Sequence, residues 1–152
     1  MSGLADADIL HRARELYQQS GRISVREAAA VFQNLEVQRI QADGSSRRFW
    51  RLRYHDESLG LLIAPEGDGQ SELDESRSVW KIGNHLFKKG VPVPELYAWD
   101  RASGIVLCED LGNLRLHDYM HCEGGDTATR ASEDRDHYYR ETIRQLANMQ
   151  IH

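Results

Sequence analysis

A short polar turn with arginines beside it is the part of this sequence best suited to bind a ligand. Residues 41–56 read QADGSSRRFWRLRYHD. Gly44 lets the backbone turn tightly, and nearby backbone N–H groups and the hydroxyls of Ser45 and Ser46 can donate hydrogen bonds to phosphate oxygens. Arg48 and the arginines around it add forked, charged donors. The same residues would also make an ordinary solvated hairpin, so phosphate binding and a plain turn both stay open.

Charge is unevenly distributed around this turn. Residues 39–53 hold five arginines against one acid, Asp43, and residues 66–75 hold five acids against no base. The arginines are Arg39, Arg47, Arg48, Arg51 and Arg53, and the acids are Glu66, Asp68, Glu72, Asp74 and Glu75. Neighbouring elements of opposite charge either face each other or share an anion.

One carboxylate in the acidic segment falls at a position where its burial would need a partner. In a helix expected over about 72–88, Glu75 shares a stripe with Val79, Ile82 and Leu86. An inward-facing carboxylate requires a cation nearby, because burying it unpaired is costly. Glu72 is the alternative for this role. Both residues would also stabilise the start of a helix simply by their charge.

Two histidines and a cysteine near residue 120 are candidate metal ligands. His117 and His121 are four residues apart, with Cys122 adjacent, and this spacing on a helix can bind zinc. Two imidazoles in a polar stretch are thin evidence, so we expect no metal here. Cys108 and Cys122 are the only cysteines. Reduced thiols fit best and predict a cytoplasmic protein, with one disulfide as the alternative.

Composition excludes several classes of protein. The chain has 152 residues, of which 40% are hydrophobic and 28% charged, and its formal net charge is −5. These values are ordinary for a globular fold, and the negative charge argues against a nucleic-acid partner. No apolar run approaches the length of a membrane span, and the first residues lack the pattern of a secretory signal.

The residue pattern predicts an α+β fold in three parts. Residues 1–35 form an N-terminal helical segment, with helices over 6–19 and from the capping box at Ser24 to about Gln33. Residues 36–112 read strand, strand, strand, helix, strand, strand, which predicts a curled, five-stranded antiparallel sheet with one helix against it. Residues 113–152 form the start of a helical region.

The last part is predicted to expose apolar surface. A short helix is expected over about 114–120, a flexible surface segment over 121–134, and a final helix from near Ser132. That helix spaces Tyr139, Ile143, Leu146 and Met149 along one face and shows no stop signal. The pattern predicts a longer natural chain, and self-association through this helix when the partner surface is missing.

The order of these elements and four motifs resemble one protein family. The motifs are DGSSRRFWRL at 43–52, GVPVPELYAWD at 90–100, GIVLCEDLG at 104–112 and YYRETIRQLANMQ at 138–150. Together they resemble the N-terminal lobe and first connecting helices of the aminoglycoside phosphotransferase and choline kinase-like superfamily. The nearer resemblance is to its bacterial branch of predicted phosphotransferases of the anomeric amino-sugar kinase type.

The resemblance implies a nucleotide site. It makes Gly44, Ser45 and Ser46 the loop that covers the phosphates. The forked donors of Arg47, Arg48 and Arg51 beside this loop would add phosphate affinity, and a solvated strand face is the alternative for them. The resemblance makes Glu75 the helix glutamate that orients a phosphate-binding base. It also makes LCEDLG a hinge. There the adenine edge would bond the backbone of Glu109 and Leu111, and Leu107 or Cys108 would line the pocket.

One expected residue is missing from this site. Kinase-like folds usually carry a lysine on the third strand for the α- and β-phosphates, but LGLLIAP at 59–65 has none, and the expected position falls near Ile63 or Ala64. An arginine replaces it, or nucleotide affinity is weak, or the site is degenerate. The sugar-kinase branch is similar in tending to lack this lysine.

The resemblance implies a function for a longer protein. The parent enzyme would transfer the γ-phosphoryl group of ATP to a hydroxyl of a sugar or amino sugar, with Mg²⁺ as cofactor. The catalytic aspartate and the magnesium ligands would lie beyond His152, so we expect no catalytic residue in this chain and no activity from it alone. The alternative is a noncatalytic interaction or regulatory module that keeps the kinase-like lobe.

Overall fold

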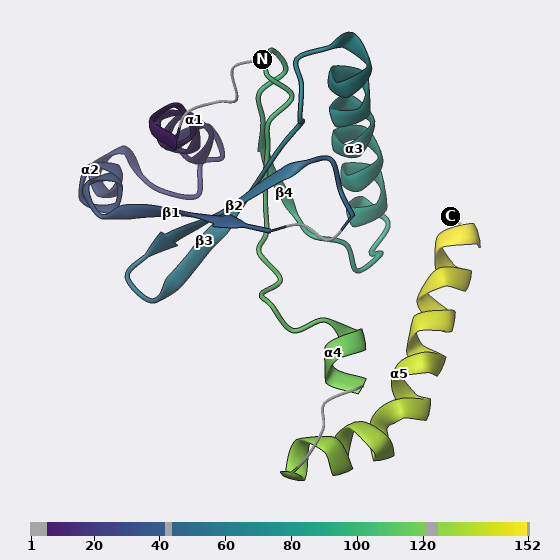
Figure 1. Ribbon diagram of the computed structural model, residues 1–152. Helices are drawn as coiled ribbons and strands as arrows, with labels where there is room; N and C mark the ends of the chain where they lie inside the picture. Colours follow the sequence, from purple (N-terminus) through teal and green to yellow (C-terminus); the bar gives the residue numbers. More distant parts are fainter. Residues whose placement is uncertain (1–5, 42–43, 121–124, 152) are drawn as a thin grey trace.

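The computed structural model describes residues 6–41, 44–120 and 125–151. The fold is α+β, with a five-stranded antiparallel sheet and several helices, as the sequence pattern predicts. Figure 1 shows helices on both sides of the sheet and a long C-terminal helix that extends away from it. None of the helices in the described ranges is both long and apolar enough to cross a membrane.

The sheet forms as the alternating sequence predicts, with β1 Leu35–Ile40, β2 Arg48–Tyr54, β3 Glu57–Ala64, β4 Leu96–Trp99 and β5 Val106–Cys108. The strand order is β1-β2-β3-β5-β4. Successive strands pair as neighbours except where the chain leaves β3, forms helix α3 and returns as β4 at the sheet edge. One helix therefore crosses between two parts of an otherwise meandering sheet.

The two N-terminal helices, α1 Asp6–Gln19 and α2 Val25–Gln33, are as predicted. The capping box at Ser24 is present, because the Ser24 hydroxyl accepts from the Glu27 N–H and the Glu27 carboxylate accepts from the Ser24 N–H. Helix α1 buries Ile9, Ala13 and Leu16 in the same core as the sheet. It is thus part of the packed unit and not an appendage to it.

Alternation along the strands separates two faces of the sheet. The covered face packs its side chains against α1 in one core cluster, and its central members are Trp50, Leu52, Leu62 and Leu107. The other face, called the open face below, carries Ile40, Phe49 and Ile63 opposite one another across β1, β2 and β3. Each large apolar side chain of the covered face contributes roughly 1.5–3 kcal/mol by leaving water.

Gly60 allows the closest approach within the sheet. Its φ is +151°, and a Cβ added there would lie 2.8 Å from the backbone oxygen of Cys108. The β2–β3 register also shifts between Leu52 and Arg53 beside this point. Glycine is required because any side chain would meet a backbone atom that cannot rotate away.

Helix α3, Gln70–Lys88, packs on the sheet through a stripe that overlaps only partly with the one predicted. Its contacts are made by Ser76 near Gly104, Trp80 against Trp99, and Gly83 near Leu96. The predicted inward stripe instead leaves Ile82 58% exposed. The predicted stripe is wrong at Glu75 and Ile82, whereas Val79 and Leu86 are half-buried. Gly83, a small residue that apolar counting overlooks, makes the close approach to β4.

The C-terminal helices are α4, Leu116–Met120, and α5, Gly125–Ile151. Helix α5 begins earlier than Ser132, so the predicted flexible segment is wrong from residue 125 onward, and residues 121–124 lie outside the described part. Alanines and an arginine between 128 and 131 favour helix and explain the extension. α5 packs on α4 and exposes a row of apolar side chains, namely Tyr139, Ile143, Leu146 and Met149. Self-association through this row stays a prediction.

Candidate functional site

The open face of the sheet carries an apolar cavity at its β5 end. This cavity has a volume of about 270 Å³ and takes side chains from four strands and the segment after β5. Its lining includes Ile40, Phe49, Leu61, Ile63, Cys108 and Leu111. Since β3 is apolar at three consecutive positions, Leu61 to Ile63, it has apolar side chains on both faces of the sheet. Each face must be shielded from water by other residues or by a ligand. The covered face has α1, and the open face has this cavity.

Several backbone groups of the segment after β5 make no hydrogen bond among the described residues. The Glu109 N–H donates to the Glu95 carbonyl at 2.8 Å, and the Glu95 N–H donates to the Glu109 carboxylate at 3.1 Å. Within the described residues, the Glu109 carbonyl and the Leu111 N–H make no hydrogen bond. A planar ligand edge with one donor and one acceptor would complement these two groups.

Leu107 and Cys108 divide between the two faces. Leu107 is fully buried in the core cluster on the covered face, and Cys108 lines the apolar cavity. Of the two residues considered from sequence, only Cys108 therefore contacts the cavity. Burial, with help from the nearby carboxylates of Asp110 and Glu109, raises the pKa of the Cys108 thiol to about 12. The thiol stays protonated at neutral pH, so it is an apolar wall and not a nucleophile.

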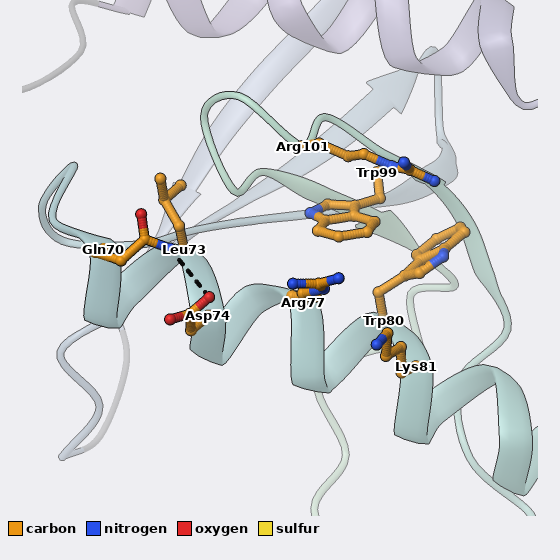
Figure 2. Close-up of a pocket in the computed structure, with 8 residues that line it drawn as sticks. All are labelled: Gln70, Leu73, Asp74, Arg77, Trp80, Lys81, Trp99 and Arg101. Atoms are coloured by element: carbon orange, nitrogen blue, oxygen red, sulfur yellow. Dashed lines mark hydrogen bonds between the residues drawn. The ribbon is translucent and has the colours of Figure 1, made fainter.

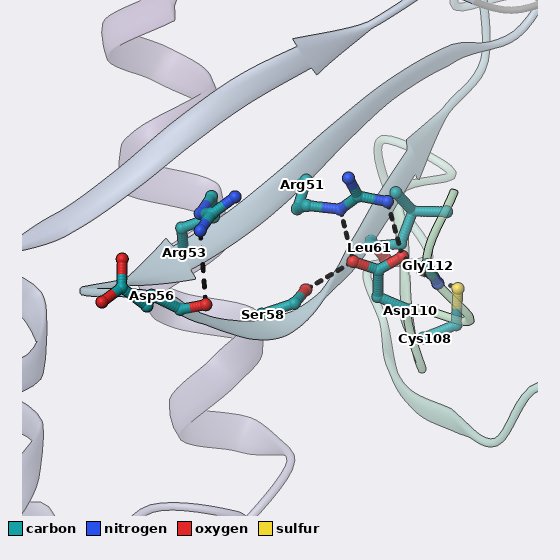
Figure 3. A network of polar contacts seen from close by, with 8 residues as sticks. All are labelled: Arg51, Arg53, Asp56, Ser58, Leu61, Cys108, Asp110 and Gly112. Atoms are coloured by element: carbon teal, nitrogen blue, oxygen red, sulfur yellow. Dashed lines mark hydrogen bonds and ion pairs between the residues drawn. The ribbon is translucent and has the colours of Figure 1, made fainter. Parts of the chain in front are cut away.

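A charged network fixes the segment after β5 to the sheet (Figure 3). Arg51 on β2 forms an ion pair with Asp110 through two guanidinium nitrogens, and the Ser58 hydroxyl and the Gly112 N–H also donate to this carboxylate. The side chains of Arg51 and Asp110 are only 10% and 6% exposed. The segment after β5 is thereby held to the β2–β3 hairpin, from which it is distant in sequence.

The carboxylate in this network stays ionised. Burial alone would raise the pKa of Asp110, but the hydrogen bonds from Arg51, Ser58 and Gly112 outweigh burial and hold the pKa below its usual value. Because this ionised carboxylate neutralises the Arg51 guanidinium, Arg51 has no free charge to offer a phosphate. Of the basic residues singled out from sequence, this one is structural.

The polar turn between β1 and β2 forms a second hollow. This turn groove has a volume of about 620 Å³, and its lining includes Arg39, Ile40, Ser45, Ser46, Arg47 and Arg48. Gly44 adopts a left-handed φ of +69°, which favours glycine at this position. Asp43 lies outside the described residues. The Ser45 hydroxyl accepts from the Arg47 N–H at 3.2 Å and keeps its own proton free to donate.

The two arginines after the serines have different partners. Arg47 forms an ion pair with Glu75 of α3, in which the two side chains are 27% and 58% exposed. Arg48 donates to the Pro65 carbonyl at 3.0 Å and lies over the Trp50 ring. The predicted burial of Glu75 is therefore wrong, because its flank of α3 faces solvent, but the cationic partner expected for it exists and is Arg47.

No lysine takes the place expected on the third strand. Ile63 lies on the open face and lines the apolar cavity, whereas Ala64 is buried in the core. Arg47, which precedes β2, is a cation that does pair with a carboxylate of α3. Its pairing with Glu75 spans 28 residues of sequence, so neither alternation nor helical spacing could have selected it among five arginines.

The histidine pair offers no metal site in the described part of the chain. His121 and Cys122 lie outside the described residues, and His117 contacts the Asp118 carboxylate at 3.4 Å. No group of three or more His, Cys, Asp or Glu side chains that could hold a metal ion is found among the described residues.

The apolar cavity and the turn groove adjoin, because Ile40 at the end of β1 lines both. Together the two hollows, called the track below, offer hydrogen-bonding backbone at one end and serines and arginines at the other. Arg39 and Arg48 reach the turn groove from the covered side of the sheet, where they lie opposite Trp50 and Ala64. The described fold defines the class no further than an α+β domain with a five-stranded antiparallel sheet. Comparison with protein-family models, curated proteins and solved structures gave no match.

Proposed function

We propose that this chain is the N-terminal, ATP-binding portion of a small-molecule phosphotransferase, built as a kinase-like N-terminal lobe. The parent enzyme would transfer the γ-phosphoryl group of ATP to a hydroxyl of a sugar or amino sugar. The observation that carries the proposal is the track in which the apolar cavity and the turn groove share Ile40. A nucleotide needs this sequence of environments, since its base is flat and apolar and its phosphates are anionic.

The adenine ring would occupy the apolar cavity. Phe49 and Ile63 offer apolar contact to its plane. The exocyclic amino group of adenine would donate to the Glu109 carbonyl, and a ring nitrogen would accept from the Leu111 N–H. The amide of Glu109 takes no part, because it is bonded to Glu95. The role expected for the backbone of Glu109 is thereby narrowed to its carbonyl.

The phosphates would occupy the turn groove. Ser45 and Ser46 supply hydroxyl donors there, and Gly44 keeps the turn backbone accessible. Arg47, oriented by Glu75, would supply the charge that a strand lysine paired with a helix glutamate supplies in protein kinases. Arg48 shares its donors between the Pro65 carbonyl and the groove.

We assign no catalytic base and no magnesium ligand to this chain. The described residues offer no acidic cluster that fits a divalent ion, so no metal-dependent step is derived from them. Mg²⁺ would arrive with the nucleotide, whose phosphates are its preferred ligands. What this chain contributes is recognition of the base and placement of the phosphates.

A noncatalytic interaction module with the same lobe is the second candidate. It is favoured by Ile63 at the place of the missing lysine and by Arg51, which Asp110 neutralises. The two candidates differ in whether the track binds nucleotide. Titration of Mg–ATP and of adenosine into the complete chain, followed by calorimetry, distinguishes them.

Replacing Leu111 by proline tests the base contact. Leu111→Pro removes the N–H donor, and Leu111→Ala is the matched control that keeps it. Both variants lose the apolar contact of the Leu111 side chain. Because the lost hydrogen bond leaves a ring nitrogen unpaired, we expect adenosine affinity to be about three- to tenfold lower for the proline variant than for the alanine variant. Thermal unfolding checks that both variants fold. If the natural chain binds neither ATP nor adenosine, the nucleotide proposal fails and the interaction module is supported.

A further inference from the structure

A third hollow, called the tryptophan groove, lies between α3 and the turn after β4 (Figure 2). Its volume is about 520 Å³, within the usual range for small-molecule sites. Trp80 of α3 and Trp99 of β4 form its wall as a stacked pair, with ring centroids 5.9 Å apart and an interplanar angle of 28°. Nothing in the proposed nucleotide track uses these residues.

The groove is positively charged on an acidic chain. Arg77, Lys81 and Arg101 surround the tryptophan pair, and Asp74 is the one acid in the lining. Asp74 accepts a hydrogen bond from the Gln70 side chain at 3.0 Å. The three cationic side chains form no ion pair within the described ranges, although Arg101 lies over the Trp99 ring, 5.4 Å from its centroid. The net charge of −5 makes this concentration of unpaired cations a local exception.

A buried donor in the same wall also lacks an acceptor. The indole N–H of Trp99 is buried and has no hydrogen-bond partner in the structure as described. Because this nitrogen is enclosed, it offers no contact to a ligand, and the groove presents aromatic surface and three cations, which is the complement of an aromatic anion.

We infer that the tryptophan groove binds a small aromatic anion, a ring carrying a carboxylate or phosphate group. The ring packs against the Trp80–Trp99 wall, which has apolar surface to cover. The anionic group meets Arg77, Lys81 and Arg101, whose charged donors favour carboxylate and phosphate oxygens. Neither part suffices alone, because exposed cations bind a bare anion weakly and a neutral ring gains nothing from them.

This site is distinct from the nucleotide track. Glu75, which faces the turn groove, and Arg77 are two residues apart on α3, so they project roughly 200° apart around the helix axis. The inference therefore stands or fails independently of ATP binding.

Three probes test the inference on the complete chain. 2-Naphthoate has both ring and charge, 2-naphthamide has the ring alone, and acetate has the charge alone. The readout is the indole N–H resonances of the tryptophans in two-dimensional NMR. Trp50 is the internal control, since it lies in the core under α1 and is only 3% exposed. We expect 2-naphthoate to shift Trp80 and Trp99 with a Kd of about 1 mM or tighter, and the other two probes to bind at least several-fold more weakly.

Charge variants locate the anion. Arg77→Gln and Lys81→Gln should each weaken 2-naphthoate binding about two- to fivefold, as expected for exposed charges. Lys88→Gln, on the last turn of the same helix, is the matched control and should leave the Kd unchanged. The inference is overturned if 2-naphthamide binds as tightly as 2-naphthoate, if Trp50 shifts with the other two, if the Arg77 and Lys81 variants bind normally, or if no shift occurs.

Discussion

Arg51 and Arg47 lie close together in the sequence, but their ion pairs differ in exposure to solvent. The ion pair of Arg51 with Asp110 is nearly excluded from solvent and is completed by Ser58 and the Gly112 N–H. The ion pair of Arg47 with Glu75 is largely solvated, and Glu75 is 58% exposed. A closed network has no capacity left for a ligand, whereas an open pair can release or share its charge. The comparison separates an arginine that holds the fold from one suited to bind phosphate.

The largest effect should come from breaking the closed network. Asp110→Asn leaves the Arg51 guanidinium buried without a counter-charge, so we expect the free energy of unfolding to fall by about 3 kcal/mol. Urea denaturation measures this loss. Asp56→Asn, at the exposed β2–β3 turn, is the matched control and should change stability by less than about 0.5 kcal/mol. A loss below about 1 kcal/mol for Asp110→Asn would show that the network contributes little.

The same network should make stability depend on acid. The folded pKa of Asp110 lies below its unfolded value, so its contribution is complete above the unfolded pKa of about 3.9 and is lost as pH falls through the folded pKa. Below about pH 4 the natural chain should therefore lose stability more steeply than Asp110→Asn, which has no carboxyl group to protonate. Parallel curves for the two proteins, measured by urea denaturation at several pH values, would contradict this assignment.

The open pair should show the reverse pattern, with a small effect on stability. Arg47→Gln breaks only a solvated ion pair, so we expect a change in the free energy of unfolding of less than about 1 kcal/mol. If the turn groove binds phosphates, ATP affinity should nevertheless fall about tenfold, because a charge-assisted hydrogen bond is lost. Arg53→Gln, at the far end of β2, is the control. Equal ATP affinity of Arg47→Gln and the natural chain, measured by calorimetry, would remove Arg47 from the phosphate site.

Local patterns in the sequence predicted the elements well. Alternation gave the strands, and the capping box at Ser24 gave the start of α2, because both depend on neighbours in sequence. The inward face of α3 was predicted only in part because Ser76 and Gly83 pack through small size and not through hydrophobicity. The three-residue strand β5 is buried at every position, so it has no alternation from which to decide between Leu107 and Cys108.

The candidate site was predictable only in part. Gly44, Ser45 and Ser46 could be selected because a turn with small residues is visible locally. The partners that give each arginine its role are remote, since Arg51 and Asp110 are separated by 59 residues. Such pairings depend on strand order and on how the segment after β5 returns to the sheet. No periodic pattern of residues in the sequence indicates them. The groove between Trp80 and Trp99 was missed for the same reason.

Helix α1 has a practical consequence for anyone who wishes to work with a shorter protein. Ile9, Ala13 and Leu16 close the core over Trp50 and Leu52, and Arg22 ties the following turn to Glu95 beside β4. A shorter protein that lacks α1 would expose these apolar core side chains to solvent and would aggregate. Expression boundaries should therefore be drawn ahead of the first helix.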